Sequence, residues 1–143
     1  MATTERERNE LAARARHAME KAYAEYSRFR VGAALMTEGR NIFEGCNVEN
    51  SSYGLTICAE RNAVFQAVAH GDKQFRSIAI ASDDAGFLSP CGACCQVLAE
   101  FNPRLEVIMT NASGKKKVIS LSKFFPVPPD LKKLSRRKPS PRR

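Results

Sequence analysis

The two most informative stretches of this sequence are Cys58-Ala59-Glu60 and, later in the chain, Pro90-Cys91-Gly92-Ala93-Cys94. Three thiols can surround one divalent metal ion and leave its fourth position to water. Catalytic zinc sites have this arrangement, whereas structural zinc sites fill all four positions with side chains. Glu60 lies two residues after the first thiol, within reach of the open position. The two stretches therefore predict a catalytic zinc site with a carboxylate beside it.

Both stretches are predicted to begin helices. The unpaired amides at a helix N-terminus stabilise thiolates, which are the form of cysteine that binds metal. Because positions three apart share a helix face, Cys91 and Cys94 can bind the same ion as Cys58. Cys95 is four positions from Cys91 and also shares a face with it. Helical spacing alone therefore leaves the choice between Cys94 and Cys95 open.

The rest of the sequence predicts an α/β fold. A capping box at Thr4-Glu5-Arg6-Glu7 begins a first helix, which helical spacing extends to about Ala24. The further elements predicted in chain order are strands Val31–Met36 and Ile42–Cys46, helix Cys58–His70, strand Arg76–Ser82, helix Cys91–Phe101, strands Leu105–Thr110 and Lys117–Ser120, and a short helix Leu121–Phe125. This order implies a three-layer α/β/α fold, in which helices cover both faces of a mixed five-stranded sheet.

The positive charge is concentrated at the C-terminus. The chain has 143 residues and a net charge of +8, with seven Lys or Arg and one Asp in residues 130–143. We therefore predict a catalytic domain over residues 1–130 and a basic, disordered tail over residues 131–143, which has too few apolar side chains to fold by burial. A solvated terminus is the simplest interpretation, although the composition also permits a nuclear-localisation or polyanion-binding segment.

The sequence favours a cytoplasmic protein. No apolar run approaches the eighteen or so residues of a membrane-spanning helix, and the N-terminus lacks the apolar stretch of a signal peptide. Three of the five cysteines lie within residues 91–95, which suits metal binding in a reducing compartment better than a disulfide framework. We expect no membrane contact; the basic tail would also permit a nuclear location.

Several motifs resemble the small, three-cysteine cytidine deaminase family. Zinc nucleobase deaminases carry the pattern H-x-E…P-C-x-x-C, with a three-cysteine variant, and Cys58 stands here in place of the histidine. The resemblance runs from about Tyr23 to Leu131 and implies hydrolytic deamination of cytidine and deoxycytidine to uridine and deoxyuridine in pyrimidine salvage. The similar segments are Tyr26-Ser27-Arg28-Phe29, Val31-Gly32-Ala33-Ala34-Leu35, Gly45-Cys46-Asn47-Val48-Glu49-Asn50, the segment from Tyr53 to Ala63, and Ser89-Pro90-Cys91-Gly92-Ala93-Cys94.

The resemblance also assigns the residues around the metal. It selects Cys94, so that Cys58, Cys91 and Cys94 are the expected ligands of one Zn²⁺ per subunit. Cys95 stands where the family usually has Arg, and we interpret it as a free, packed thiol. Glu60 is implied as the proton shuttle of the reaction, serving ring N3 and the departing amine.

Arg61 is implied as a residue that acts on the ligands. Three thiolates and Zn²⁺ carry a net charge of −1, which works against acidification of a bound water. Arg61 lies three residues after Cys58, where its guanidinium can withdraw charge from the sulfurs.

The resemblance further implies the substrate contacts. Asn47 and Glu49 look like the family's ribose-binding pair, since an amide and a carboxylate two residues apart on an extended segment face the same side. A homotetramer with shared active sites is expected. The other implied contacts are Phe29 against the substrate, the Ala59 backbone and Ser89 at the base, and Tyr53 across a subunit boundary.

The sequence departs from the family after the last short helix. Members often have a Phe there that reaches a neighbour's active site, but the segment after Phe125 is shortened and has no aromatic residue beyond Pro126. Three alternatives stay open: a polynucleotide cytosine deaminase that uses the basic tail, an aminonucleoside-antibiotic deaminase, and a structural-zinc nucleic-acid-binding module. The first usually has His as its first ligand, and the Asn47/Glu49 pair favours a free nucleoside. Nucleic acid is therefore not the expected partner.

Overall fold

The structure is a computed structural model that describes residues 2–131. Apart from Leu131, the predicted basic tail lies outside the described residues, and the domain boundary at residue 130 stays a prediction. The elements in chain order are α1 (Glu5–Met19), β1 (Val31–Thr37), β2 (Ile42–Cys46), the 3₁₀ helix η1 (Tyr53–Leu55), α2 (Ala59–Ala69), β3 (Phe75–Ser82), α3 (Gly92–Phe101), β4 (Glu106–Thr110), β5 (Lys116–Ser120) and α4 (Leu121–Phe124).

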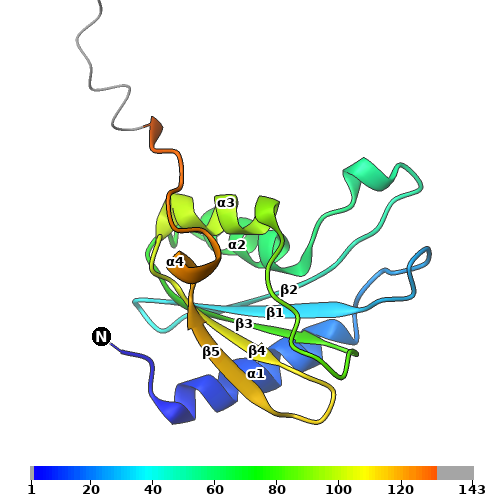
Figure 1. Ribbon diagram of the computed structural model, residues 1–143, viewed down its shortest axis with the longest axis horizontal. Coiled ribbons are helices and arrows are strands. Elements are labelled where there is room, and N and C mark those ends of the chain that lie inside the picture. The colour runs from blue at the N-terminus through cyan, green and yellow to red at the C-terminus, as the bar shows by residue number, and fades with distance from the viewer. Residues whose placement is uncertain (1, 132–143) are drawn as a thin grey trace, which may run out of the picture.

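The five strands form one mixed sheet in the order β2-β1-β3-β4-β5. Strands β3 and β4 are parallel, and the other neighbouring pairs are antiparallel. Helix α1 lies on one face of the sheet, and α2 and α3 lie side by side on the other (Figure 1). The predicted three-layer α/β/α architecture is thus confirmed.

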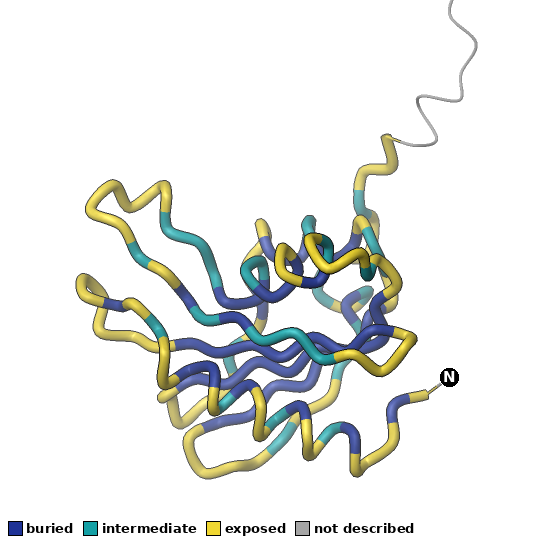
Figure 2. Tube along the Cα trace, turned by 180° about the vertical axis from the view of Figure 1, so that it is seen from behind, coloured by how far each residue is buried: buried dark blue, intermediate teal, exposed yellow. Residues whose placement is uncertain are grey.

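The central strands supply both halves of the core. Every residue of β1 is buried. Because successive side chains of a strand point to opposite faces of the sheet, β1 contributes to the core on both faces. Ala33 and Leu35 pack in the cluster that includes α2 and α3, whereas Ala34 and Met36 pack with α1. Figure 2 shows the same pattern as a buried band through the middle of the sheet, with exposed loops around it.

Helix α1 ends earlier than predicted. Its capping box is present, because the Thr4 hydroxyl accepts from the Glu7 amide and the Glu7 carboxylate accepts from the Thr4 amide. The helix stops at Met19, however, and not near Ala24. Tyr23 instead pairs with the segment after β2, where its amide donates to the Asn47 carbonyl at 2.9 Å. This long-range pairing replaces the helical hydrogen bonds of the last predicted turn. The other predicted helices and strands agree with the structure to within one residue at each end, and η1 was not predicted.

Gly45 brings α2 close to the sheet. A Cβ atom at this position would lie 2.3 Å from the Ala59 carbonyl oxygen and 2.4 Å from the Ala63 amide nitrogen, so no larger residue fits. Both contacts lie in the first turns of α2. The missing side chain of Gly45 therefore helps to fix the position of the helix N-terminus at Cys58.

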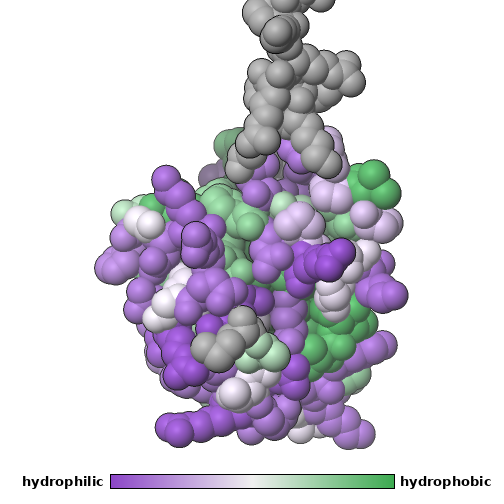
Figure 3. Space-filling view, turned by 90° about the vertical axis from the view of Figure 1, so that its left-hand side faces the viewer, coloured by the Kyte–Doolittle hydropathy of each residue, from purple (hydrophilic) through white to green (hydrophobic). Residues whose placement is uncertain are grey.

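The surface is unevenly polar. The side that carries the N-terminus is mainly hydrophilic, with separate hydrophobic patches (Figure 3). Around η1, by contrast, Tyr53 is 75% exposed and Leu55 is 65% exposed. None of the described helices combines the length and the apolar character needed to cross a membrane.

Candidate active site

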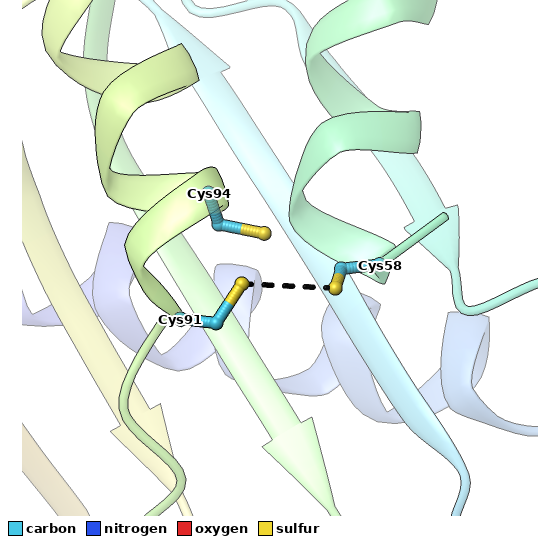
Figure 4. Close-up of side chains that lie close together, drawn as sticks. All are labelled: Cys58, Cys91 and Cys94. Carbon is cyan, nitrogen blue, oxygen red and sulfur yellow. Dashed lines mark hydrogen bonds between the residues drawn. The ribbon is translucent and has the colours of Figure 1, made fainter. Parts of the chain in front are cut away.

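Three sulfurs converge between the N-termini of α2 and α3. Cys58 is the N-cap of α2, Cys91 is the N-cap of α3, and Cys94 lies in the first turn of α3. Their Sγ atoms point toward one another (Figure 4) and all lie within 4.8 Å of each other. The predicted grouping of these cysteines is therefore present.

The spacing of the sulfurs fits a zinc ion. Zinc binds thiolates at about 2.3 Å in a tetrahedral arrangement, which places the sulfurs about 3.8 Å apart. The Cys58 and Cys91 Sγ atoms are 3.9 Å apart. Within residues 2–131, no fourth His, Cys, Asp or Glu atom joins this group. The set of three soft ligands thus fits one zinc ion per subunit with a position open for chemistry.

Cys95 is separate from the sulfur group. It is 3% exposed, and its thiol donates to the Pro90 carbonyl at 3.6 Å. Burial raises the pKa of this thiol, and its sulfur lies outside the group formed by Cys58, Cys91 and Cys94. Cys95 is thus a packed thiol outside the group of three sulfurs, and its exclusion as a ligand stays a prediction.

Arg61 lies against the sulfurs, as predicted. Its Nη2 donates to Cys58 Sγ at 3.3 Å. The pKa of the Cys58 thiol is lowered to about 5, because the Cys94 thiol and then Arg61 hydrogen-bond its sulfur. The pKa of Cys94 is raised in turn, since its thiol proton is held between the two sulfurs. The hydrogen bond from Arg61 therefore stabilises negative charge on the Cys58 sulfur, as its predicted role requires.

Glu60 is buried beside the thiols. It lies in the first turn of α2 and is 4% exposed. Burial raises the pKa of its carboxyl group to about 7. A carboxyl group in such a setting can both accept and release a proton near neutral pH, which is the requirement for a proton shuttle.

A cavity of about 250 Å³ opens onto Cys58, Cys91 and Glu60. We call it the site cavity. It brings together the predicted substrate residues Phe29, Asn47, Glu49, Ala59 and Ser89. The remaining lining residues are Ser27, Val31, Thr56, Cys58, Glu60, Leu88 and Cys91.

The predicted sugar-binding pair also anchors a loop. The Asn47 side chain accepts from the Val31 amide at 2.9 Å and donates to the Phe29 carbonyl at 2.8 Å. Glu49 Oε1 accepts from the amides of Tyr26 and Ser27 at 2.9 and 3.0 Å. Both side chains therefore hold the segment that carries Phe29 against the end of β2.

Tyr53 does not line the site cavity. It lines a neighbouring cavity of about 310 Å³, and its ring meets Tyr26 edge-on at 5.9 Å. This position is compatible with the contact across a subunit boundary expected for Tyr53. Four residues that line the site cavity had no predicted role: Ser27, Val31, Thr56 and Leu88. Ser27 belongs to the segment Tyr26-Ser27-Arg28-Phe29, on which the resemblance partly rests. Nothing in the sequence, however, indicated what Ser27 itself does.

Comparison with known proteins identifies the family. The model of the cytidine and deoxycytidylate deaminase zinc-binding region matches residues 5–110. The chain belongs to this family. The matched region covers α1 through β4 and includes all three clustered cysteines and Glu60.

Individual relatives agree with this assignment. A cytidine deaminase of Sporosarcina psychrophila is 47% identical over 117 residues, covering 81% of this chain and 86% of the relative. The crystal structure of cytidine deaminase from Burkholderia pseudomallei is 47% identical, with a TM-score of 0.81 over 87% of this chain and 98% of that one. The cytidine deaminase structure from Mycobacterium tuberculosis is 35% identical, with a TM-score of 0.73, covering 84% of this chain and 94% of that chain. The matches in sequence and the matches in structure therefore indicate the same family and the same fold.

Proposed function

We propose that this family member catalyses the hydrolytic deamination of cytidine and deoxycytidine to uridine and deoxyuridine, with release of ammonia. The observation that carries the proposal is one cavity lined by two of the three clustered cysteines, by the buried Glu60, and by Asn47 and Glu49. Residues 1–130 would form the catalytic domain. A purely structural zinc site would need neither the open ligand position nor Glu60.

The reaction exchanges an amino group for an oxygen at C4 of the ring. Cys58, Cys91 and Cys94 would hold a zinc ion, which when bound would act as a Lewis acid and make water a nucleophile near neutral pH. Glu60 takes a proton from the attacking water and delivers it to ring N3. After the water oxygen has bonded to C4, Glu60 takes the remaining proton of that oxygen and passes it to the amino group, so that the C4–N bond breaks, ammonia leaves and a uracil ring remains. Arg61 offsets part of the negative charge of the three thiolates.

Substrate binding uses the other walls of the site cavity. Asn47 and Glu49 would bind sugar hydroxyls, because the amide and the carboxylate both reach the cavity from the segment after β2. Phe29 would pack against the nucleoside, and the Ala59 backbone and Ser89 would contact the base. Hydrogen bonds to the 3′-hydroxyl would favour a free nucleoside as substrate, because the 3′-oxygen of a nucleotide within a polymer is esterified.

The proposed assembly is a homotetramer with shared active sites. Its support is the exposure of four large apolar side chains, Val48, Tyr53, Leu55 and Phe65. Val48 and Phe65 line one surface cavity, and Tyr53 lines the cavity next to the site cavity. Large exposed apolar groups are typical of protein interfaces. We expect sedimentation equilibrium to give four times the subunit mass of 15.8 kDa. A monomer with full nucleoside turnover would contradict both the assembly and the role of Tyr53.

The proposed biological role is pyrimidine salvage in the cytoplasm. Deamination converts cytosine nucleosides into uracil nucleosides, which re-enter the pyrimidine pool. Reduced thiols, as the three zinc ligands require, persist in a reducing compartment.

The activity can be tested with purified, zinc-loaded protein. Cytidine, deoxycytidine and a cytosine-containing single-stranded oligonucleotide are offered in parallel, and ammonia release is followed together with the fall in ultraviolet absorbance. We expect turnover of both nucleosides and none of the oligonucleotide. Turnover of the oligonucleotide alone would overturn the proposal in favour of a polynucleotide deaminase.

A further inference from the structure

The loop that carries Phe29 belongs to no helix or strand. It connects α1 with β1, and Arg28 adopts a left-handed backbone with φ of 60° immediately before Phe29. Non-glycine residues adopt this conformation only where neighbouring contacts hold them there. The position of the Phe29 ring in the site cavity therefore depends on the contacts that fix this loop.

The Ser27 hydroxyl makes two of these contacts. It donates to Glu49 Oε2 at 2.5 Å and accepts from the Phe29 amide at 3.0 Å. The second bond spans Arg28 and closes a turn around its left-handed backbone. One oxygen atom thus connects the proposed sugar-binding carboxylate with the aromatic residue proposed to pack against the nucleoside.

The contacts of Glu49 leave little freedom for a ligand. A carboxylate offers about four lone-pair sites, two on each oxygen. Both sites of Oε1 are used by the amides of Tyr26 and Ser27. Oε2 accepts from the Ser27 hydroxyl and keeps one site. A sugar hydroxyl bound by Glu49 would therefore donate to Oε2, the same atom that Ser27 orients.

Ser27 also affects the charge state of Glu49. Hydrogen bonds from the Ser27 hydroxyl and the Ser27 amide, in that order, lower the pKa of Glu49. An ionised carboxylate is the stronger acceptor for a sugar hydroxyl. Loss of the hydroxyl would therefore weaken both the orientation and the charge of the acceptor.

We propose that Ser27 is a positioning residue that sets selectivity for the sugar, by orienting Glu49 Oε2 toward a sugar hydroxyl and holding Phe29 in the site cavity. The inference rests on the proposed nucleoside activity and adds a residue to it. Ser27 need not touch the reacting atoms. Its contribution should therefore depend on whether the substrate carries the hydroxyl that Glu49 binds.

The test compares two substrates in the Ser27→Ala variant of the zinc-loaded, full-length protein. Hydrogen bonds to charged groups predict a fall in kcat/KM for cytidine of about 10- to 100-fold. For 2′,3′-dideoxycytidine, which lacks the 2′- and 3′-hydroxyls, we expect a fall at least fivefold smaller. The ratio of kcat/KM for cytidine to that for the dideoxynucleoside should therefore fall at least fivefold. Ser27→Thr keeps a hydroxyl and should restore most of that ratio, and exposed Ser51→Ala should leave it unchanged.

Two further results guard the inference. A double variant of Ser27→Ala with Glu49→Gln should lose no more cytidine selectivity than Glu49→Gln alone, since the hydroxyl acts through the carboxylate. The inference would be overturned if Ser27→Ala lowered kcat/KM equally for both substrates, or if the losses of the two single variants added up in the double variant. Ser27 would then have only a general structural role. If Ser27→Ala does not fold, the substrate ratio of Ser27→Cys decides in its place, because a thiol is a much weaker donor. Wild-type protein that deaminates no nucleoside would instead contradict the proposed function itself.

Discussion

Glu60→Gln is expected to lower kcat for cytidine by roughly 10²- to 10⁴-fold, the usual contribution of a positioned general acid–base. The amide has nearly the same size and shape as the carboxyl group, and position 60 is only 4% exposed, so the packing of α2 should persist. The amide cannot take up or release the proton that the reaction moves. Ammonia release under saturating substrate, with zinc measured by atomic emission on the same sample, provides the test.

A matched control separates chemistry from charge. Glu25 is exposed and lies outside the site cavity, so Glu25→Gln removes a carboxylate without touching the site. We expect full zinc content in both variants but a loss of turnover only in Glu60→Gln. Unchanged turnover in Glu60→Gln would exclude the proton-shuttle role. Loss of zinc together with turnover would show that Glu60 supports the metal site, and not proton transfer.

Much of the metal site could be predicted from sequence because its signals are local. Cys58 and Cys91 each cap a helix, and Cys94 follows one turn later, so short-range spacing nearly specifies the geometry. The choice of Cys94 over Cys95 needed the family pattern, because spacings of three and four both fit one helix face. In the structure the difference is one of direction: Cys94 faces the other sulfurs, whereas Cys95 faces the Pro90 carbonyl.

The parts that sequence did not predict depend on contacts between distant residues. The end of α1 is set by pairing of Tyr23 with Asn47 and Glu49, which no helical periodicity records. The contacts of Ser27 with Glu49 span 22 positions and leave no repeating pattern. Asn47 and Glu49 were predicted as sugar ligands from the resemblance to the family, and their second role as anchors of the Phe29 loop emerges only in three dimensions.

The two adjacent thiols offer the sharpest test of the metal site. Cys94→Ala is expected to remove bound zinc almost completely and to reduce turnover to background, because two thiolates and a water are a poor site for zinc. Cys95→Ala should retain one zinc per subunit and most of the activity, since its thiol points away from the sulfur group. Zinc content after dialysis against a mild chelator, together with the rate of ammonia release, measures both effects.

Thermal unfolding gives an independent measure of the difference in zinc binding between Cys94→Ala and Cys95→Ala. Zinc that binds the folded chain stabilises it by mass action, so the wild-type Tm should fall when a strong chelator is added. Cys95→Ala should show the same dependence from a slightly lower starting Tm, because it loses a buried sulfur. Cys94→Ala should melt at one temperature with or without chelator. If Cys95→Ala lost the chelator dependence and Cys94→Ala kept it, the ligand set would have to be Cys58, Cys91 and Cys95, and the first turn of α3 would have to rotate when metal binds.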